Sequence, residues 1–158
     1  MHTARELGIS ARPLAFLDAR HMQHGDVQFV DAVVQSLRTL SGDGVLKLLA
    51  THEPGSLAVE LAARGYRITS CQRREDAWDI EISAPHTPDI ADLRDMEAPE
   101  PMHHVLTAAS LLEGSQTYFA RLPHVPHPLF PLLRERGLRW WTHEELDRTA
   151  LLAVRAGG

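Results

Sequence analysis

Two short stretches that resemble each other decide the fold, LDARHM (residues 17–22) and ADLRDM (residues 91–96). Aligned, they share an aspartate, an arginine and a methionine: Asp18 with Asp92, Arg20 with Arg94, and Met22 with Met96. Further matches fall on turn residues, helix faces and one histidine: Gly42 with Gly114, His52 with His124, Pro54 with Pro126, Leu57 with Leu129, Leu61 with Leu133, and Gly65 with Gly137. Because the matches fall on positions that shape turns and helices, the pattern predicts that the chain contains two copies of one unit.

Each repeat is expected to follow the order βαβαββ. A short strand (residues 15–19 and 90–93) precedes an amphipathic helix, with Asp26 as the N-cap in the first copy and Pro101 in the first turn in the second. The SGDG of residues 41–44 is predicted to be the turn that ends the first helix. Second strands follow at 45–50 and 117–122, and second helices are expected to end at Gly65 and Gly137.

The expected fold class is therefore α/β, as two α+β two-layer sandwiches in tandem. The repeats span residues 12–84 and 89–156, and the two prolines of APHTPD (residues 84–89) indicate a linker. Units of this size are marginally stable alone, so the repeats are expected to pack on each other. Trp78, Trp140 and Trp141 are candidates either for covering that shared surface or for filling their own cores.

The composition excludes several classes of protein. The 158 residues are 44% hydrophobic and carry 16 basic against 21 acidic side chains, a balance that argues against a nucleic-acid partner. No apolar run is long enough to cross a membrane, and charges in MHTARELGIS (residues 1–10) occupy the place of a signal peptide's apolar stretch. We therefore expect a cytoplasmic protein. A single cysteine, Cys71, excludes an internal disulfide framework and a cysteine-based metal cage.

Three longer segments carry a family resemblance: ADLRDMEAPEPM (residues 91–102), RLPHVPHPLFPLLRERG (residues 121–137) and ATHEPGSLAVELAARG (residues 50–65). They resemble the TusA/SirA-like sulfur carriers. More closely, they are similar to an uncharacterised sister family, a domain of unknown function, with a His-[Asp/Glu]-Pro turn after the second strand. The resemblance implies two tandem TusA-like units and a role in bacterial redox, metal or nitrogen-oxide metabolism.

Two departures from the carriers bear on function. The carriers place a nucleophilic cysteine before the proline that opens the first helix, where the helix dipole lowers the thiol pKa. Here Ala98 precedes Pro99, and in the first copy His24 precedes Gly25, so persulfide carriage by that mechanism is not expected. Cys71 is predicted to lie in the third strand, at a core or sheet position. The turn departs too, because Val125 replaces the acidic residue in the second copy.

The ten histidines point to a candidate site. Both loops of a βαβ unit emerge at the carboxyl edge of the sheet, where ligands of open α/β sheets gather. The ligand-binding candidates are the histidines and acidic residues of these loops: His24, His52, Glu53, Glu100, His124 and His127. No residue is assigned a catalytic role.

Four interpretations of His52 and His124 remain open. They can stabilise the turn, or bind zinc, copper, nickel or iron together with neighbouring histidines and carboxylates, for which His124 and His127 are the better pair. They can also bind a small anion together with the helix N-termini, or act as general acids and bases. We expect a non-catalytic module that binds a partner protein, a metal or a small ligand. The alternative is a metal-dependent enzyme or redox component that uses these histidines.

Overall fold

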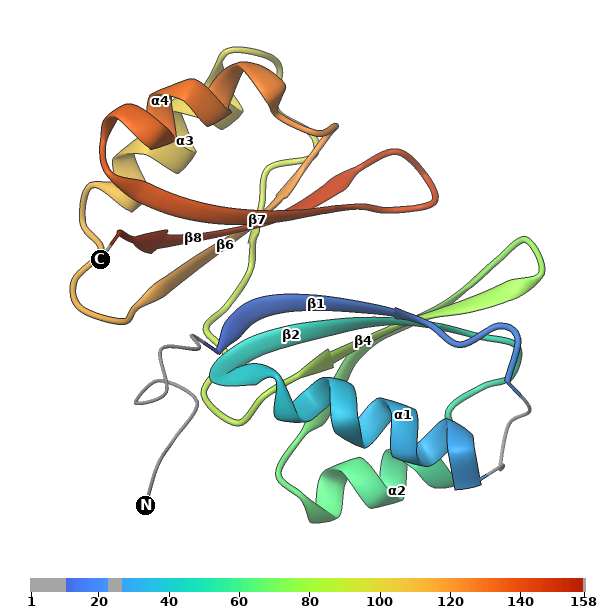
Figure 1. The fold of residues 1–158 in the computed structure, drawn as a ribbon. Coiled ribbons are helices and arrows are strands. Elements are labelled where there is room, and N and C mark those ends of the chain that lie inside the picture. The colour runs from blue at the N-terminus through green and yellow to red at the C-terminus, as the bar shows by residue number, and fades with distance from the viewer. Residues whose placement is uncertain (1–10, 23–26, 158) are drawn as a thin grey trace. The chain divides into compact units, whose positions relative to one another are not determined.

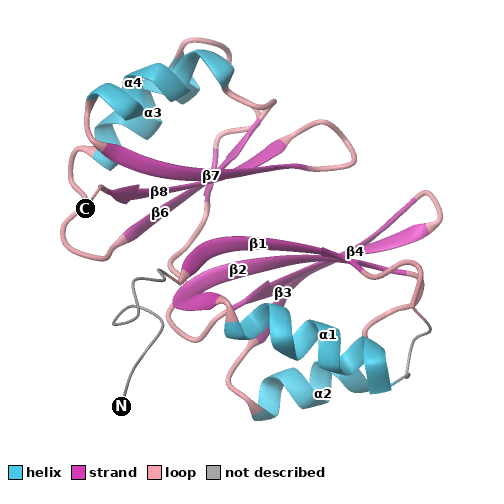
Figure 2. Cartoon of the chain, in the orientation of Figure 1, coloured by secondary structure: helices cyan, strands magenta, loops and turns pink. Residues whose placement is uncertain are grey.

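The structure is a computed structural model that describes residues 11–22 and 27–157. The chain divides between Thr87 and Pro88 into two compact units, which we call unit 1 and unit 2 (Figure 1). Each unit is a four-stranded mixed sheet with helices against it, in the order βαβαββ, as Figure 2 shows. The prediction of two α/β two-layer sandwiches is confirmed. Among the helices of the described residues, none has the length and apolarity that a bilayer crossing requires.

Unit 1 has the sheet order β1-β2-β4-β3. Its elements are β1 (Arg12–Asp18), α1 (Val27–Arg38), β2 (Leu40–Ala50), α2 (Ser56–Ala63), β3 (Arg67–Arg74) and β4 (Ala77–Ser83). Strands β1 and β2 are parallel, and the other pairs are antiparallel. The predicted N-cap Asp26 and the candidate ligand His24 lie outside the described residues.

Unit 2 has the equivalent sheet order β5-β6-β8-β7. Its elements are β5 (Ala91–Asp92), α3 (Glu100–Ala109), β6 (Thr117–Leu122), the 3₁₀ turn η1 (His127–Leu129), α4 (Phe130–Glu135), β7 (Leu138–Glu144) and β8 (Ala150–Ala156). The first strand is shorter than expected, with only two residues paired to β6. The second helix is also shorter, because the prolines of PLFP confine its beginning to a 3₁₀ turn.

The prediction that SGDG (residues 41–44) is the turn that ends the first helix is wrong, because these residues belong to β2. The pairing of β1 with β2 jumps between Arg12 and Leu14, so residues 41–44 form a bulge. Residues after β4 form hydrogen bonds with the backbone of this bulge: Ala84 N–H and Thr87 Oγ1 donate to the Gly44 carbonyl at 3.0 and 2.7 Å. A glycine-rich stretch can thus continue a strand when a neighbouring segment pairs with it.

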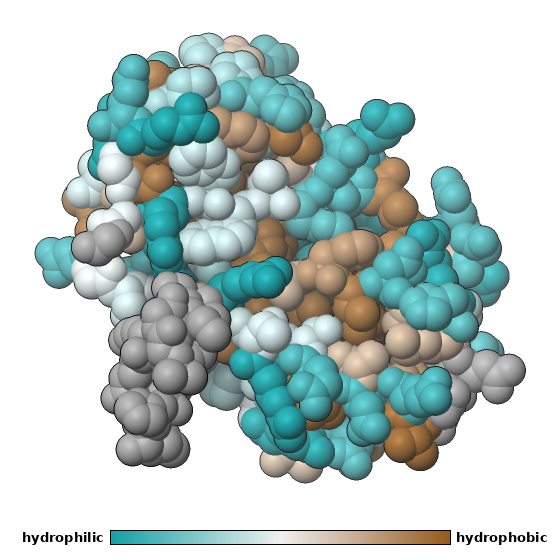
Figure 3. Space-filling view, viewed as in Figure 1, coloured by the Kyte–Doolittle hydropathy of each residue, from teal (hydrophilic) through white to brown (hydrophobic). Residues whose placement is uncertain are grey.

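Each unit buries its own apolar core between the helices and one face of the sheet. In unit 1 the largest buried side chains come from both helices and from β2 and β4: Phe29, Leu61, Leu46, Leu48, Ile80 and Ile82. In unit 2 the core is built from α3, η1, α4 and the strands: Val105, Leu129, Leu133, Leu122, Leu152 and Val154. On the visible face of each unit, hydrophilic and hydrophobic residues are interspersed (Figure 3).

Several smaller predictions are confirmed. Gly65 and Gly137 follow the second helices with φ of +89° and +71°, the left-handed conformation expected there. Trp78 and Trp140 pack against their own cores, which supports the core-filling interpretation for these two tryptophans.

Candidate functional site

The first strand of each unit ends in the same Asp-x-Arg lock. In unit 2, Asp92 Oδ1 accepts the Arg94 backbone N–H at 3.2 Å and Nε at 2.8 Å, while Oδ2 accepts Nη2 at 2.6 Å. Asp18 and Arg20 make the same three contacts in unit 1. The hydrogen bonds from Arg94 lower the pKa of Asp92 to about 2, and those from Arg20 lower the pKa of Asp18. The lock fixes the turn by which the chain leaves the sheet edge.

In unit 2 the loop after this lock leads into α3. Glu100 N–H donates to the Glu97 carbonyl at 2.9 Å, and Pro99 is the N-cap of the helix. Glu100 and Pro101 occupy the first turn. Because proline has no N–H and the Glu100 N–H is already used, this helix end offers few donors to an anion. The Glu100 carboxylate also disfavours negative charge there.

The second loop of unit 2 is a rigid proline-rich turn. His127 N–H donates to the Val125 carbonyl at 3.0 Å across Pro126, which has φ −89° and ψ 64°. These values describe an inverse γ-turn. The same Val125 carbonyl lies 3.2 Å from Nδ1 of His124. One carbonyl oxygen therefore holds both the turn and the His124 ring.

These two loops enclose an apolar pocket with a volume of about 110 Å³. Its lining comes from the segment before and inside α3, from the last residue of β6 and from the segment that follows β6: Ala98, Pro99, Pro101, Met102, Leu122, Pro123, His124, Pro126, Pro128 and Leu129. Five of these residues are prolines, and His124 is the sole polar one. The pocket lies at the carboxyl edge of the sheet, where the topology predicts a ligand site.

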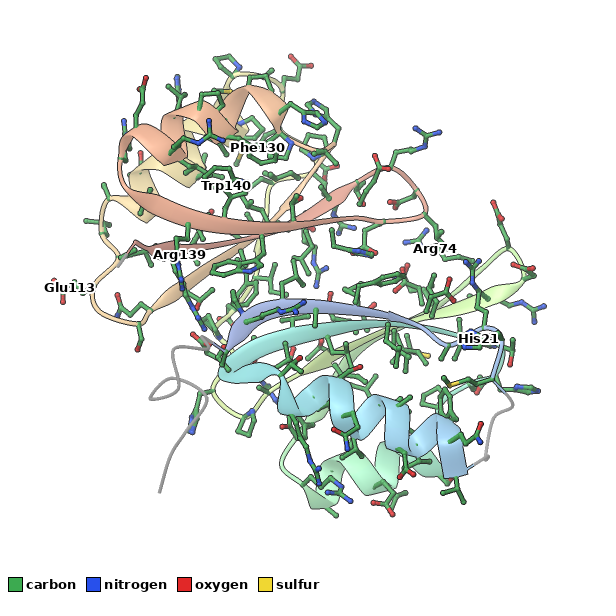
Figure 4. All side chains as sticks on the ribbon, in the orientation of Figure 1. His21, Arg74, Glu113, Phe130, Arg139 and Trp140 are labelled. Atoms are coloured by element: carbon green, nitrogen blue, oxygen red, sulfur yellow. The ribbon has the colours of Figure 1, made fainter. Side chains whose placement is uncertain are left out.

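The candidate residues of unit 2 have different surroundings. His124 lines the pocket, whereas His127 makes an edge-to-face contact with Phe130, with ring centroids 5.6 Å apart. Phe130 in turn stacks on Trp140, and Figure 4 shows these two rings side by side between α4 and β7. Glu100 is exposed and is not part of the lining.

The corresponding loops of unit 1 hold His52 and Glu53 at exposed positions. His52 Nδ1 lies 2.8 Å from the Thr51 hydroxyl, which can donate or accept. In residues 11–22 and 27–157, no three His, Cys, Asp or Glu side chains gather as a metal ion would require. Metal binding by His52 in unit 1, or by His124 and His127 in unit 2, stays a prediction.

Cys71 lies in β3, so the predicted sheet position is right, but the side chain is exposed and not in the core. Partial burial raises the pKa of this thiol, and the charges of Glu53 and Asp79 raise it further. A raised pKa keeps the sulfur protonated near neutral pH and makes it a poor nucleophile.

Two features were not predicted from the sequence: the apolar lining of the pocket in unit 2 and a buried ionic group in unit 1. Lys47 Nζ lies 3.1 Å from Asp79 Oδ1 and 3.5 Å from Glu81 Oε1, and all three side chains are buried. They alternate with core residues along VLKLLA and WDIEIS, which places them on the sheet face opposite the helices. This alternation of charged and apolar residues is the sequence signal that could have predicted the ionic group.

Comparison with known proteins bears on one unit. Residues 90–155 match the family model described as Uncharacterized conserved protein (DUF2249). Unit 2 is therefore similar to this family. The match spans β5 to β8 and thus includes both loops of the pocket. No curated protein matches the chain.

Proposed function

We propose that this protein is a non-catalytic binding module whose unit 2, the part similar to the DUF2249 family, holds a small apolar group in the pocket between residues 98–102 and 122–129. The observation that carries the proposal is the pocket lining, in which nine apolar side chains and one histidine converge at the carboxyl edge of the sheet. A small ligand and an apolar side chain of a partner protein offer this pocket the same chemistry.

The size of the pocket sets the size of the group. A dry apolar cavity of about 150 Å³ accepts benzene. At about 110 Å³, this pocket suits a branched alkyl chain or a five-membered ring. The prolines have little conformational freedom to lose, which favours a preformed site.

We also propose that the module shares the architecture of the sulfur carriers and lacks their chemistry. Ala98, which stands where those carriers have their cysteine, lines the pocket, so an apolar wall replaces a nucleophile. Cys71 belongs to the other unit and has a raised pKa. We propose accordingly that the protein carries no persulfide.

We further propose that residues 12–84 are a diverged tandem copy of the same TusA-like domain. Support comes from the equal strand orders, the identical Asp-x-Arg contacts, and the left-handed glycine after the second helix of each unit. Unit 1 then retains the scaffold, while its loops differ from those that form the pocket.

The proposal is tested by titrating the full chain with cyclopentanone, followed by amide NMR shifts. We expect binding of roughly millimolar affinity, as for other small fragments, with the largest shifts in residues 98–102 and 122–129. Ala98→Leu, which fills the pocket, and Met102→Phe, which narrows it from α3, should each weaken binding at least about tenfold. The matched control Ala63→Leu, at an exposed position of α2, should bind as the wild type does.

Shifts confined to other parts of the chain would contradict the proposal. So would unchanged affinity in both filled variants, provided that their amide spectra show the native fold.

A further inference from the structure

The hydrogen bonds of His124 determine which polar group a ligand can present to the pocket. A backbone carbonyl oxygen only accepts hydrogen bonds. The contact of 3.2 Å between Nδ1 and the Val125 carbonyl therefore requires the proton on Nδ1. In a neutral imidazole the other nitrogen, Nε2, is then an acceptor.

The inverse γ-turn keeps the Val125 carbonyl in place. This oxygen already accepts the His127 N–H at 3.0 Å, and Pro126 between them has no N–H of its own. The acceptor is thus fixed by the backbone and does not depend on a mobile side chain. In unit 1 the equivalent His52 meets a hydroxyl, which can satisfy either tautomer.

Among the lining side chains, His124 is the sole one with a nitrogen or oxygen atom, and Nε2 is the ring nitrogen that the Val125 carbonyl does not engage. The other nine lining side chains are Ala, Pro, Leu and Met, none of which donates a hydrogen bond. No carboxylate, amine or guanidinium is part of the lining. A neutral ligand with one donor fits this environment better than an ion does.

Building on the proposed function, we infer that the pocket selects a neutral apolar group that carries one hydrogen-bond donor, a hydroxyl or an N–H, directed at Nε2 of His124. An aliphatic or alicyclic alcohol of about six heavy atoms is the simplest example. The apolar body fills the space between the prolines, and the donor pairs with the imidazole acceptor.

Two probes of matched shape test the inference at pH 8, where an imidazole is ordinarily neutral. Cyclopentanol donates and accepts, whereas cyclopentanone only accepts. Their dissociation constants are measured by NMR titration in the wild type and in His124→Leu. The ratio of the two constants in the variant corrects for the different hydration of the probes.

After that correction, the wild type should prefer cyclopentanol by about 3- to 10-fold, the worth of one hydrogen bond. His124→Gln, which can accept through its amide oxygen, should keep part of the preference, and the control His52→Leu should keep all of it. Equal corrected affinities, or a preference for the ketone, would overturn the inference while leaving the proposed function intact. Failure of both probes to bind would instead remove the proposed function on which the inference rests.

Discussion

Unit 1 and unit 2 share a strand order, an Asp-x-Arg lock and a terminal glycine, yet they differ in two places. The loops at the carboxyl edge of the sheet form an apolar pocket in unit 2, whereas in unit 1 they carry an exposed His52 and Glu53. The sheet face opposite the helices holds Lys47, Asp79 and Glu81 in unit 1. The two units thus share contacts that hold the scaffold and differ in their loops and in the polarity of this sheet face.

The largest expected effect concerns this sheet face. At the register positions of Lys47, Asp79 and Glu81, unit 2 has the buried apolar residues Phe119, Leu151 and Ala153: Lys47 pairs with Glu81 as Phe119 pairs with Ala153. Lys47→Met leaves two buried carboxylates without their lysine and should lower the free energy of unfolding by about 3–5 kcal/mol.

The triple change Lys47→Phe, Asp79→Leu and Glu81→Ala copies unit 2 and should recover at least half of that loss, because the three buried charges are removed together. Arg74, whose Nε lies 3.9 Å from Asp79 Oδ2, loses this partner but is partly exposed to solvent. Urea denaturation curves measure both variants. If the triple variant is less stable than Lys47→Met, the two sheet faces are not equivalent.

The two left-handed glycines give a smaller contrast. Alanine at Gly137 adds a Cβ in open space, so the cost is that of the positive φ alone, about 1 kcal/mol. At Gly65 the new Cβ would also lie 3.3 Å from Cγ of Pro85. We therefore expect Gly65→Ala to be the more destabilising of the two, measured as a difference in the denaturation midpoint. The reverse order would show that the Pro85 contact relaxes at no cost.

The Asp-x-Arg locks should have the smallest effect on stability, because both pairs are exposed. Asp92→Asn should cost less than about 1 kcal/mol at pH 7. The pKa of Asp92 is lowered to about 2 in the folded protein, so its carboxylate stabilises the fold above about pH 4. That contribution disappears as the pH falls towards 2.

The stability difference between the wild type and Asp92→Asn should therefore shrink from pH 5 to pH 2, as followed by thermal unfolding. Asp18→Asn should show the same trend, because the pKa of Asp18 is lowered by the same kind of contact. A difference that stays constant with pH would mean that the lock acts through shape and not through charge.

The sequence predicts much of the fold because the fold depends on local signals. Apolar residues at helical spacing place Phe29 and Val105 in their cores, and Gly65 and Gly137 mark where helices end. The prediction of a turn at SGDG was wrong because these residues pair with residues 84–87. That pairing is a tertiary contact, which a glycine-rich composition does not reveal.

The candidate site was predicted only in part. His124 follows from its place at the sheet edge, but the pocket around it consists of Pro, Ala, Leu and Met, which a search for chemically reactive residues passes over. The signal was the concentration of prolines in the two loops of unit 2, which unit 1 does not share. Which prolines face one another depends on the packing of α3 against β6, and a sequence does not give that geometry.

The most direct test of the pocket uses the ε-methyl groups of the methionines as NMR probes during titration of the full chain with cyclopentanol. Met22, Met96 and Met102 all pack against the cores of their own units, but of these three only Met102 lines the pocket. If the pocket binds this alcohol, the Met102 methyl resonance should shift most, in a saturable way, and this shift should be lost in Ala98→Leu. A titration in which Met102 does not move, or moves no more than Met22, would contradict the proposal.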